Sequence, residues 1–221
     1  AFILEPLVQC ATGMGMYHSI YLAKARELCT QYHIHLIDDE IAVGFGRTGK
    51  MFAFEHANIK PDFICLSKGL TGGYLPLSAV LTTDNVYMAF YEDKVEKGFL
   101  HSHSYTGNPL ACSAALGTLN YFENHDVINQ NHKTSAYISE RMKMFSILPI
   151  SNLRNIGMIW AFDLEGTTKK TLKKISTKAI DRGLLIRPIG HTIYFMPPYI
   201  INHDEIDFMV DTAFEVIQSS I

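Results

Sequence analysis

The sequence predicts an α/β protein, with a mostly parallel sheet in its N-terminal part and a second, smaller α/β domain in its C-terminal part. The apolar runs 34–38 and 62–66 are too short for helices and stop abruptly at charged or polar residues, which is typical of buried strands. A helical pattern separates the first of these runs from a strand-like run at the start, which indicates a β-α-β unit with parallel strands. From about residue 125 the sequence changes to polar helices and short strands, so we expect domains at 1–124 and 125–221.

The first domain is expected to open with a strand at 1–4, which Glu5 and Pro6 end because proline cannot donate to a strand ladder. A helix is expected over 17–32, followed by the strand at 34–38. The apolar side chains of this helix are expected to share one face: Tyr17, Tyr21, Ala25, Leu28 and Tyr32.

Two further strands, at 62–66 and 75–82, are expected to flank a glycine-containing turn. Asn108 is a favourable N-cap and Pro109 suits the first position of a helix, so a helix is expected to begin there. Its apolar face is expected to carry Ala111, Ala114, Ala115, Leu119 and Phe122.

The C-terminal domain is expected to begin with a polar helix that ends near residue 148. The elements expected after it are a strand at 157–164, a helix from Thr171 that Gly183 closes, and short strands at 184–186 and 193–196. A final helix opens with Asn202 and Glu205 in capping-box spacing. Its expected buried residues are Ile206, Met209, Val210, Ala213 and Ile217.

Composition narrows the class of protein. The chain has 221 residues, of which 48% are hydrophobic and 19% charged, so it can bury a sizeable core. A net charge of -3 without a basic run argues against nucleic acid as the main partner. No apolar stretch approaches the ~18 residues of a membrane span, and the start lacks the positive region of a signal peptide, so the cytosol is expected. The four cysteines form no Cys-x-x-Cys pair and are expected to be free thiols.

The start of the chain suggests that the sequence begins partway through a longer protein. Ala1 stands directly in a strand-like run, with no preceding turn or helix to cover it. A sheet that began there would have an unprotected edge.

Two charged residues follow the apolar runs at 34–38 and 62–66. Asp39 comes directly after the first run, and Lys68 follows the second and precedes flexible glycines. Because ligands of α/β sheets bind outside the carboxyl ends of strands, these two residues are expected to face one pocket. Asp39 alone has an equally plain interpretation as a turn acid, and Asp38 beside it would serve as well.

A lysine and an acid in one pocket suit pyridoxal phosphate (PLP) chemistry. The lysine amine binds the cofactor aldehyde, and the acid partners the pyridine nitrogen. An apolar strand that delivers Lys68 favours a partly desolvated amine with a lowered pKa.

Two other motifs are weaker. The glycine-dense loop at 44–49 lacks the Gly-Lys-Ser/Thr end of a P-loop and the spacing of a dinucleotide motif, so no nucleotide site is expected there. His101, Ser102 and His103 offer two histidines without a third ligand nearby, so no metal site is expected.

The segment Asp-Glu-Ile-Ala-Val-Gly-Phe-Gly-Arg-Thr-Gly (39–49), followed by Ser-Lys-Gly-Leu-Thr-Gly-Gly (67–73), resembles the class III (fold type I) PLP-dependent aminotransferases. The resemblance implies an incomplete fold type I transferase: part of the large sheet domain plus a small C-terminal domain. It implies Lys68 and Asp39 as catalytic residues. Ile41, His103 and Ser104 would join them in holding PLP, with Ser104 reaching the cofactor of a neighbouring subunit in a homodimer. Glu5, Arg47, Arg187 and Tyr194 would line the substrate side, where the Arg187 guanidinium could clamp a carboxylate.

Four segments, 3–9, 46–57, 101–112 and 193–201, are most similar to members of this family that act in biotin biosynthesis. That similarity implies S-adenosylmethionine as amino donor and 8-amino-7-oxononanoate as acceptor. Two alternatives stay open: another class III ω-aminotransferase, acting on ornithine, 4-aminobutyrate or a diamine, and an inactive truncated remnant of such an enzyme. The family's phosphate-binding turn and the aromatic that stacks on the cofactor would both lie before Ala1.

Overall fold

The computed structural model describes residues 1–221, which divide into two compact units. Unit 1 consists of Ala1–Leu7, Tyr17–Phe45 and Met51–Asp126, and unit 2 of Val8–Met16, Gly46–Lys50 and Val127–Ile221. The last change of unit lies close to the boundary expected after residue 124. Two short segments that the sequence pattern placed in the first domain nevertheless fold with unit 2. None of the helices has the length and apolar character needed to cross a membrane.

Unit 1 is built on a four-stranded sheet in the order β1-β4-β5-β6. The strands are β1 (Phe2–Leu4), β4 (Leu36–Asp39), β5 (Phe63–Leu66) and β6 (Ala79–Thr82). The first three are parallel, as predicted, and β6 runs antiparallel to β5, which makes the sheet mixed. The last strand begins four residues later than position 75, where the sequence pattern placed it.

Helix α1 (Ser19–Gln31) connects β1 to β4 and packs on one face of the sheet. Its buried residues are Leu22, Ala25 and Cys29, which contact Leu4 and Leu36. The predicted face was therefore wrong in part, since Tyr21, Leu28 and Tyr32 are exposed. Apolar residues occupy two faces of α1. The face that packs on the sheet is the one that carries Leu22 and Ala25.

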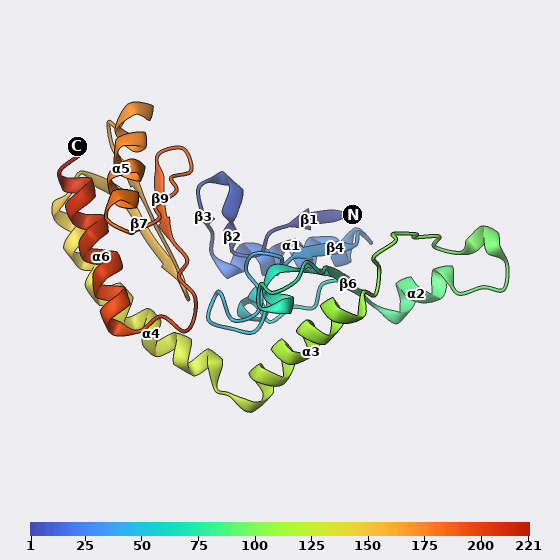
Figure 1. The fold of residues 1–221 in the computed structure, drawn as a ribbon. Coiled ribbons are helices and arrows are strands. Elements are labelled where there is room, and N and C mark those ends of the chain that lie inside the picture. The colour runs from blue at the N-terminus through green and yellow to red at the C-terminus, as the bar shows by residue number, and fades with distance from the viewer. The chain divides into compact units, whose positions relative to one another are not determined.

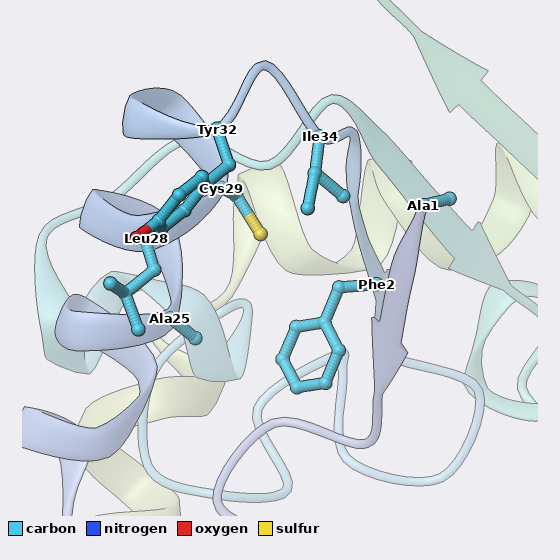
Figure 2. A pocket seen from close by; sticks show the side chains of 7 residues that line it. All are labelled: Ala1, Phe2, Ala25, Leu28, Cys29, Tyr32 and Ile34. Carbon is cyan, nitrogen blue, oxygen red and sulfur yellow. The ribbon is translucent and has the colours of Figure 1, made fainter.

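The second apolar face of α1 borders a shallow pocket beside β1 (Figure 2). Leu28 and Tyr32 line it from the helix, Phe2 lines it from the strand, and Ile34 completes it. Cys29 also reaches this pocket. All four cysteines are free, as predicted, although only Cys29 is fully buried.

The rest of unit 1 consists of short helices around the sheet. They are η2 (Ala53–Ala57), η3 (Lys68–Thr71), α2 (Asp84–Phe90), η4 (Val95–Lys97) and α3 (Pro109–Asn124). The Asn108 carboxamide caps α3 by accepting from the Leu110 N–H at 3.0 Å, as predicted. Ala111 and Ala115 are its buried residues, and Leu119 and Phe122 pack beside the same core. The stretch with α2 and η4 extends away from the sheet of its unit (Figure 1).

Unit 2 is a three-stranded antiparallel sheet in the order β7-β8-β9, with helices on one face. The strands are β7 (Ile150–Ile156), β8 (Ile159–Leu164) and β9 (Thr192–Phe195), and the long helices are α4 (Val127–Met142), α5 (Lys169–Asp181) and α6 (His203–Gln218). The turn η5 (Lys143–Ile147) follows α4 and supplies Phe145 to the core. The five residues predicted for the buried face of α6 are all buried, and Asn202 and Glu205 form the predicted capping box.

Two predictions about strands in unit 2 were wrong. Strand β7 was missed, because a register shift between Ser151 and Arg154 interrupts its alternation of polar and apolar residues. Residues 184–186 are not a strand. The Leu184 N–H donates to the Ala179 carbonyl at 2.8 Å, so these residues continue the C-terminal cap of α5.

A small hairpin, β2 (Val8–Gln9) and β3 (Gly15–Met16) with η1 (Cys10–Thr12) between them, was also not predicted. Arg154 ties it to the sheet of unit 2. The guanidinium donates to the Met14 carbonyl at 2.9 Å and to the Gly13 carbonyl at 2.6 Å, and it forms an ion pair with Asp163. One half-buried arginine thus joins this hairpin to two strands that lie far along the chain.

The segment Gly46–Lys50 packs on the turn between β7 and β8. The Met158 N–H donates to the Arg47 carbonyl at 2.9 Å. Gly157, at the turn, has φ +53, and a Cβ there would lie 2.5 Å from the Arg47 carbonyl oxygen and 2.6 Å from the Gly49 nitrogen. Only glycine fits at this point.

We expect Gly157→Ala to destabilise the protein by roughly 3 kcal/mol or more, because the new methyl group overlaps the backbone of 47–49. Gly166→Ala is the matched control. Gly166 has φ +63 with nothing within 4 Å of its Cβ position, so it should cost only about 1 kcal/mol for backbone strain. Urea unfolding of both variants measures the difference, and equal losses would contradict the close approach.

Candidate active site

The site begins where β4 and β5 end. These strands are parallel, and Asp39 pairs with Cys65 in their register. Lys68 follows Cys65 by three residues and opens η3 directly after β5. An acid and an amine therefore come from neighbouring strand ends at one carboxyl edge of the sheet. That the two side chains face one pocket stays a prediction.

Strand alternation separates the acids of the run 38–40. Asp39 is half-buried on the same face of the sheet as Cys65, whereas Asp38 and Glu40 are fully buried on the opposite face. One carboxylate oxygen of Asp39 accepts a hydrogen bond from the Ile41 N–H at 3.0 Å. This bond fixes the acid at the strand end.

Lys68 has an unusual backbone. Its φ is +42, in the left-handed region that residues with a Cβ seldom adopt. The turn around it is held by Leu70 N–H donating to the Ser67 carbonyl at 2.9 Å and by the Ser67 hydroxyl donating to the Leu77 carbonyl at 2.7 Å. The side chain of Lys68 is exposed, so residues 1–221 do not supply the desolvation that the sequence pattern suggested. Backbone strain at this lysine is typical of a functional position.

Asp38 is a buried acid without a hydrogen-bond partner. Both of its carboxyl oxygens lack a partner, and its neighbours in the strand register are Leu4 on β1 and Ile64 on β5. Burial raises the pKa of Asp38 to about 7, and the positive charge of Arg26 offsets only part of that rise. Near neutral pH, a large share of this carboxyl group is therefore protonated in the folded protein.

Glu40, the other buried acid, is well partnered. Its carboxylate accepts from the Ala53 N–H and from the Phe54 N–H, both at 3.0 Å. Burial raises the pKa of Glu40 to about 7, although the two backbone hydrogen bonds act in the opposite direction. Sequence reasoning missed this residue. The signal was available, since Glu40 lies two residues from Asp38 and alternation places both on the buried face.

The other predicted residues of unit 1 lie on several elements. Ile41 is half-buried directly after β4, and Glu5 is half-buried after β1, where its carbonyl accepts from the Tyr17 hydroxyl at 2.6 Å. His103 and Ser104 are exposed on the extended segment before α3. There the His103 ring nitrogen Nδ1 accepts from the Tyr105 N–H at 3.2 Å.

Three predicted residues belong to unit 2. Arg47 donates to the Pro197 carbonyl at 2.8 Å, and its guanidinium carbon lies 4.4 Å from the centre of the Tyr199 ring. Burial lowers the pKa of Arg47. Arg187 is exposed beyond α5, and Tyr194 is half-buried on β9. Each unit is a body of its own, so the structure groups Lys68 with Asp39 but does not group either with Arg187.

The residues of the sheet edge fit PLP. A free amine on Lys68 suits the aldehyde, the Asp39 carboxylate suits a pyridine nitrogen, and the exposed Ser104 hydroxyl suits a phosphate. No group of three or more His, Cys, Asp and Glu residues is arranged to hold a metal ion. This donor set, on an α/β fold, is of the kind that the class of PLP-dependent proteins uses.

Comparison with known proteins places the chain within that class. Residues 1–217 match the family model described as aminotransferase class-III, and the chain belongs to this family. It is 50% identical over 224 residues to adenosylmethionine-8-amino-7-oxononanoate aminotransferase of Helicobacter pylori, covering 98% of this chain and 51% of that protein. The corresponding protein of Aquifex aeolicus is 39% identical over 223 residues, covering 96% of this chain and 49% of the relative.

Solved structures agree with this placement. The adenosylmethionine-8-amino-7-oxononanoate aminotransferase of Methanocaldococcus jannaschii superposes with a TM-score of 0.93 at 35% identity, over 99% of this chain and 53% of that one. An ornithine aminotransferase of Plasmodium yoelii superposes with a TM-score of 0.87 at 29% identity, over 100% of this chain and 57% of that one. The chain spans about half the length of the relatives that it matches.

We expect Asp38→Asn to stabilise the protein above neutral pH but not in acid. Asp38 has a folded-state pKa of about 7 against an ordinary value of 3.8. The wild type therefore loses stability as the pH rises from about 4 to about 7, because only the unfolded chain ionises freely there. Above pH 7 the loss levels off near about 4 kcal/mol. Denaturant unfolding between pH 4 and pH 9 measures it, with the exposed Asp93→Asn as control. A gain that is the same at every pH would contradict the buried, neutral acid.

Proposed function

We propose that the protein carrying this chain transfers an amino group from S-adenosylmethionine to 8-amino-7-oxononanoate, with PLP as cofactor, and so forms 7,8-diaminononanoate for biotin biosynthesis. The relatives at 50% and 39% identity both carry the name of that reaction. The observation that carries the proposal is the parallel register of β4 and β5, because it brings Asp39 and Lys68 to one edge of the sheet.

Each residue of this edge has a role in the proposed reaction. Bound PLP supplies an electron sink for the bond that breaks at the substrate carbon. Lys68 would hold the cofactor aldehyde through Nζ, and its amine would move the proton at the substrate carbon. The Asp39 carboxylate keeps a proton on the pyridine nitrogen. Hydrogen bonds to charged groups contribute about 1.5–3 kcal/mol, which is enough to bias that protonation.

The remaining predicted residues would surround these two. Ile41 packs on one face of the cofactor ring, and His103 and Ser104 bind its phosphate. Arg187 clamps a substrate carboxylate. The substrate side of the site is lined by Glu5, Arg47 and Tyr194. Arg47 is already bonded to the Pro197 carbonyl and stacked on Tyr199, which favours a role in shaping this wall over direct contact with substrate.

A homodimer in the cytosol, with its active site at the subunit interface, completes the proposal. Ser104 lies between η4 and α3, directly after the stretch with α2 and η4 that extends away from the sheet of its unit (Figure 1). This segment exposes the large apolar side chains of Phe99, Leu100 and Tyr105. The ring of Phe99 contacts the rings of Phe90 and His101. Exposed apolar surface of this kind suits contact with a second copy.

A second candidate function is that of another class III ω-aminotransferase, because an ornithine aminotransferase also superposes with a TM-score of 0.87. Such an enzyme would share the cofactor residues. Its amino donor would differ.

The amino donor is therefore the decisive test of the proposed function. We expect the protein carrying this chain, supplied with PLP and 8-amino-7-oxononanoate, to form 7,8-diaminononanoate with S-adenosylmethionine and not with alanine, ornithine or 4-aminobutyrate. Product is measured by mass spectrometry. Transfer from ornithine or 4-aminobutyrate alone would favour the second candidate, and no transfer from any donor would favour an inactive remnant.

We expect Lys68→Ala to lower turnover by about 10²–10⁴-fold or more, because proton transfer at the substrate carbon loses its base. The fold should persist, since the Lys68 side chain is exposed. Lys60→Ala is the matched control, an exposed lysine just before the other end of β5. Turnover is followed by product formation and the fold by circular dichroism. Normal turnover in Lys68→Ala would end the assignment.

A further inference from the structure

We propose that Glu40 is a positioning residue. Its hydrogen bonds act as a latch, which fixes the chain next to Asp39, the acid assigned to the cofactor, and so holds Asp39 and Ile41 in place. This inference rests on the proposed function, because it assigns Asp39 to the cofactor. By strand alternation, the Glu40 side chain lies on the face of the sheet opposite to Asp39, and so away from the side assigned to the cofactor.

The backbone of Glu40 extends the sheet beyond the acid. Its N–H donates to the Cys65 carbonyl at 3.0 Å, which continues the pairing of β4 with β5 one residue past Asp39. Its carbonyl accepts from the Gly44 N–H at 2.9 Å, which closes the turn that contains Ile41. The residue directly after Asp39 is thus held through both its N–H and its carbonyl.

The carboxylate of Glu40 makes a second connection, to residues further along the chain. Residues 41–52 leave the sheet, and Ala53 and Phe54 begin the helix η2. The first N–H groups of a helix have no partner within the helix. Glu40 accepts from both of these N–H groups at 3.0 Å, one with each oxygen, and so caps η2 from the end of β4.

The latch is anchored to a packed layer. Phe54 and Ala57 of η2 pack against the core of α1 and the sheet, which includes Leu22 and Leu36. A bond from Glu40 to η2 therefore connects the end of β4 to the rigid part of unit 1 rather than to a free loop.

Gly44 shows how closely the latch is packed. A Cβ on this residue would lie 2.9 Å from the Glu40 carbonyl oxygen and 3.4 Å from its carboxylate oxygen Oε2. Gly44 does not have a positive φ, so its lack of a side chain is required by Glu40 and not by its own backbone. This gives a second way to disturb Glu40 without changing its charge.

The test compares Glu40→Gln with Gly44→Ala in the protein carrying this chain. Glutamine keeps one acceptor for the two N–H groups of η2, whereas Gly44→Ala crowds the backbone carbonyl of Glu40 and leaves its carboxyl group chemically intact. We expect each variant to bind PLP about tenfold more weakly and to lose kcat, while KM for the amino donor changes little. The readouts are absorbance titration with PLP, steady-state kinetics and thermal unfolding. If Glu40→Gln does not fold, Gly44→Ala alone decides.

Asp62→Asn is the matched control for a purely structural effect. Asp62 latches the opposite end of the same strand, since its carboxylate accepts from the Leu36 N–H and from Arg26, both at 2.7 Å. We expect this variant to lose thermal stability but to bind PLP within about twofold of wild type. Equal losses of PLP binding in Asp62→Asn and Glu40→Gln, or none in Glu40→Gln and Gly44→Ala, would overturn the inference. A wild-type protein that takes up no PLP would instead overturn the proposed function.

Discussion

The candidate site depends on one register, that of β4 against β5. In this pairing Asp39 lies opposite Cys65, and Lys68 follows at the end of the neighbouring strand. A slip of a single residue would turn Asp39 to the buried face and bring Asp38 or Glu40 to the open one. The buried face resists such a slip, because Leu36 and Leu4 are already packed beneath α1. Packing on one side of the sheet thus decides which acid is available on the other.

The same register buries the carboxyl groups of Asp38 and Glu40, and burying an ionised carboxyl group costs free energy. Glu40 offsets its burial with two backbone hydrogen bonds, whereas Asp38 has none. An acid that is fully buried without a partner is tolerated only because it can take up a proton. Stability near neutral pH is therefore lower than the packing of unit 1 would allow.

Much of this fold was predictable because its signals are local. The ends of β4 and β5, the cap at Asn108 and the buried face of α6 all follow from short patterns in the sequence. The face of α1 was not, since apolar residues lie on both sides of that helix and only the sheet decides between them. For the site, the ends of two short apolar runs and the resemblance to class III aminotransferases indicated Asp39 and Lys68. Alternation with Asp38 could have indicated that Glu40 is buried, but its partners at 53 and 54 are visible only once the chain has folded back.

The hairpin held by Arg154 has a consequence for how this protein is made. The hydrogen bond from Arg154 to Met14 joins residues 140 positions apart. On the ribosome, residues 8–16 emerge long before the strands that they pack on have been synthesised. Until those strands arrive, the Gly13 and Met14 carbonyls can bond only to water or to temporary neighbours. The bonds that hold this hairpin therefore cannot form until translation has passed Arg154 and Asp163.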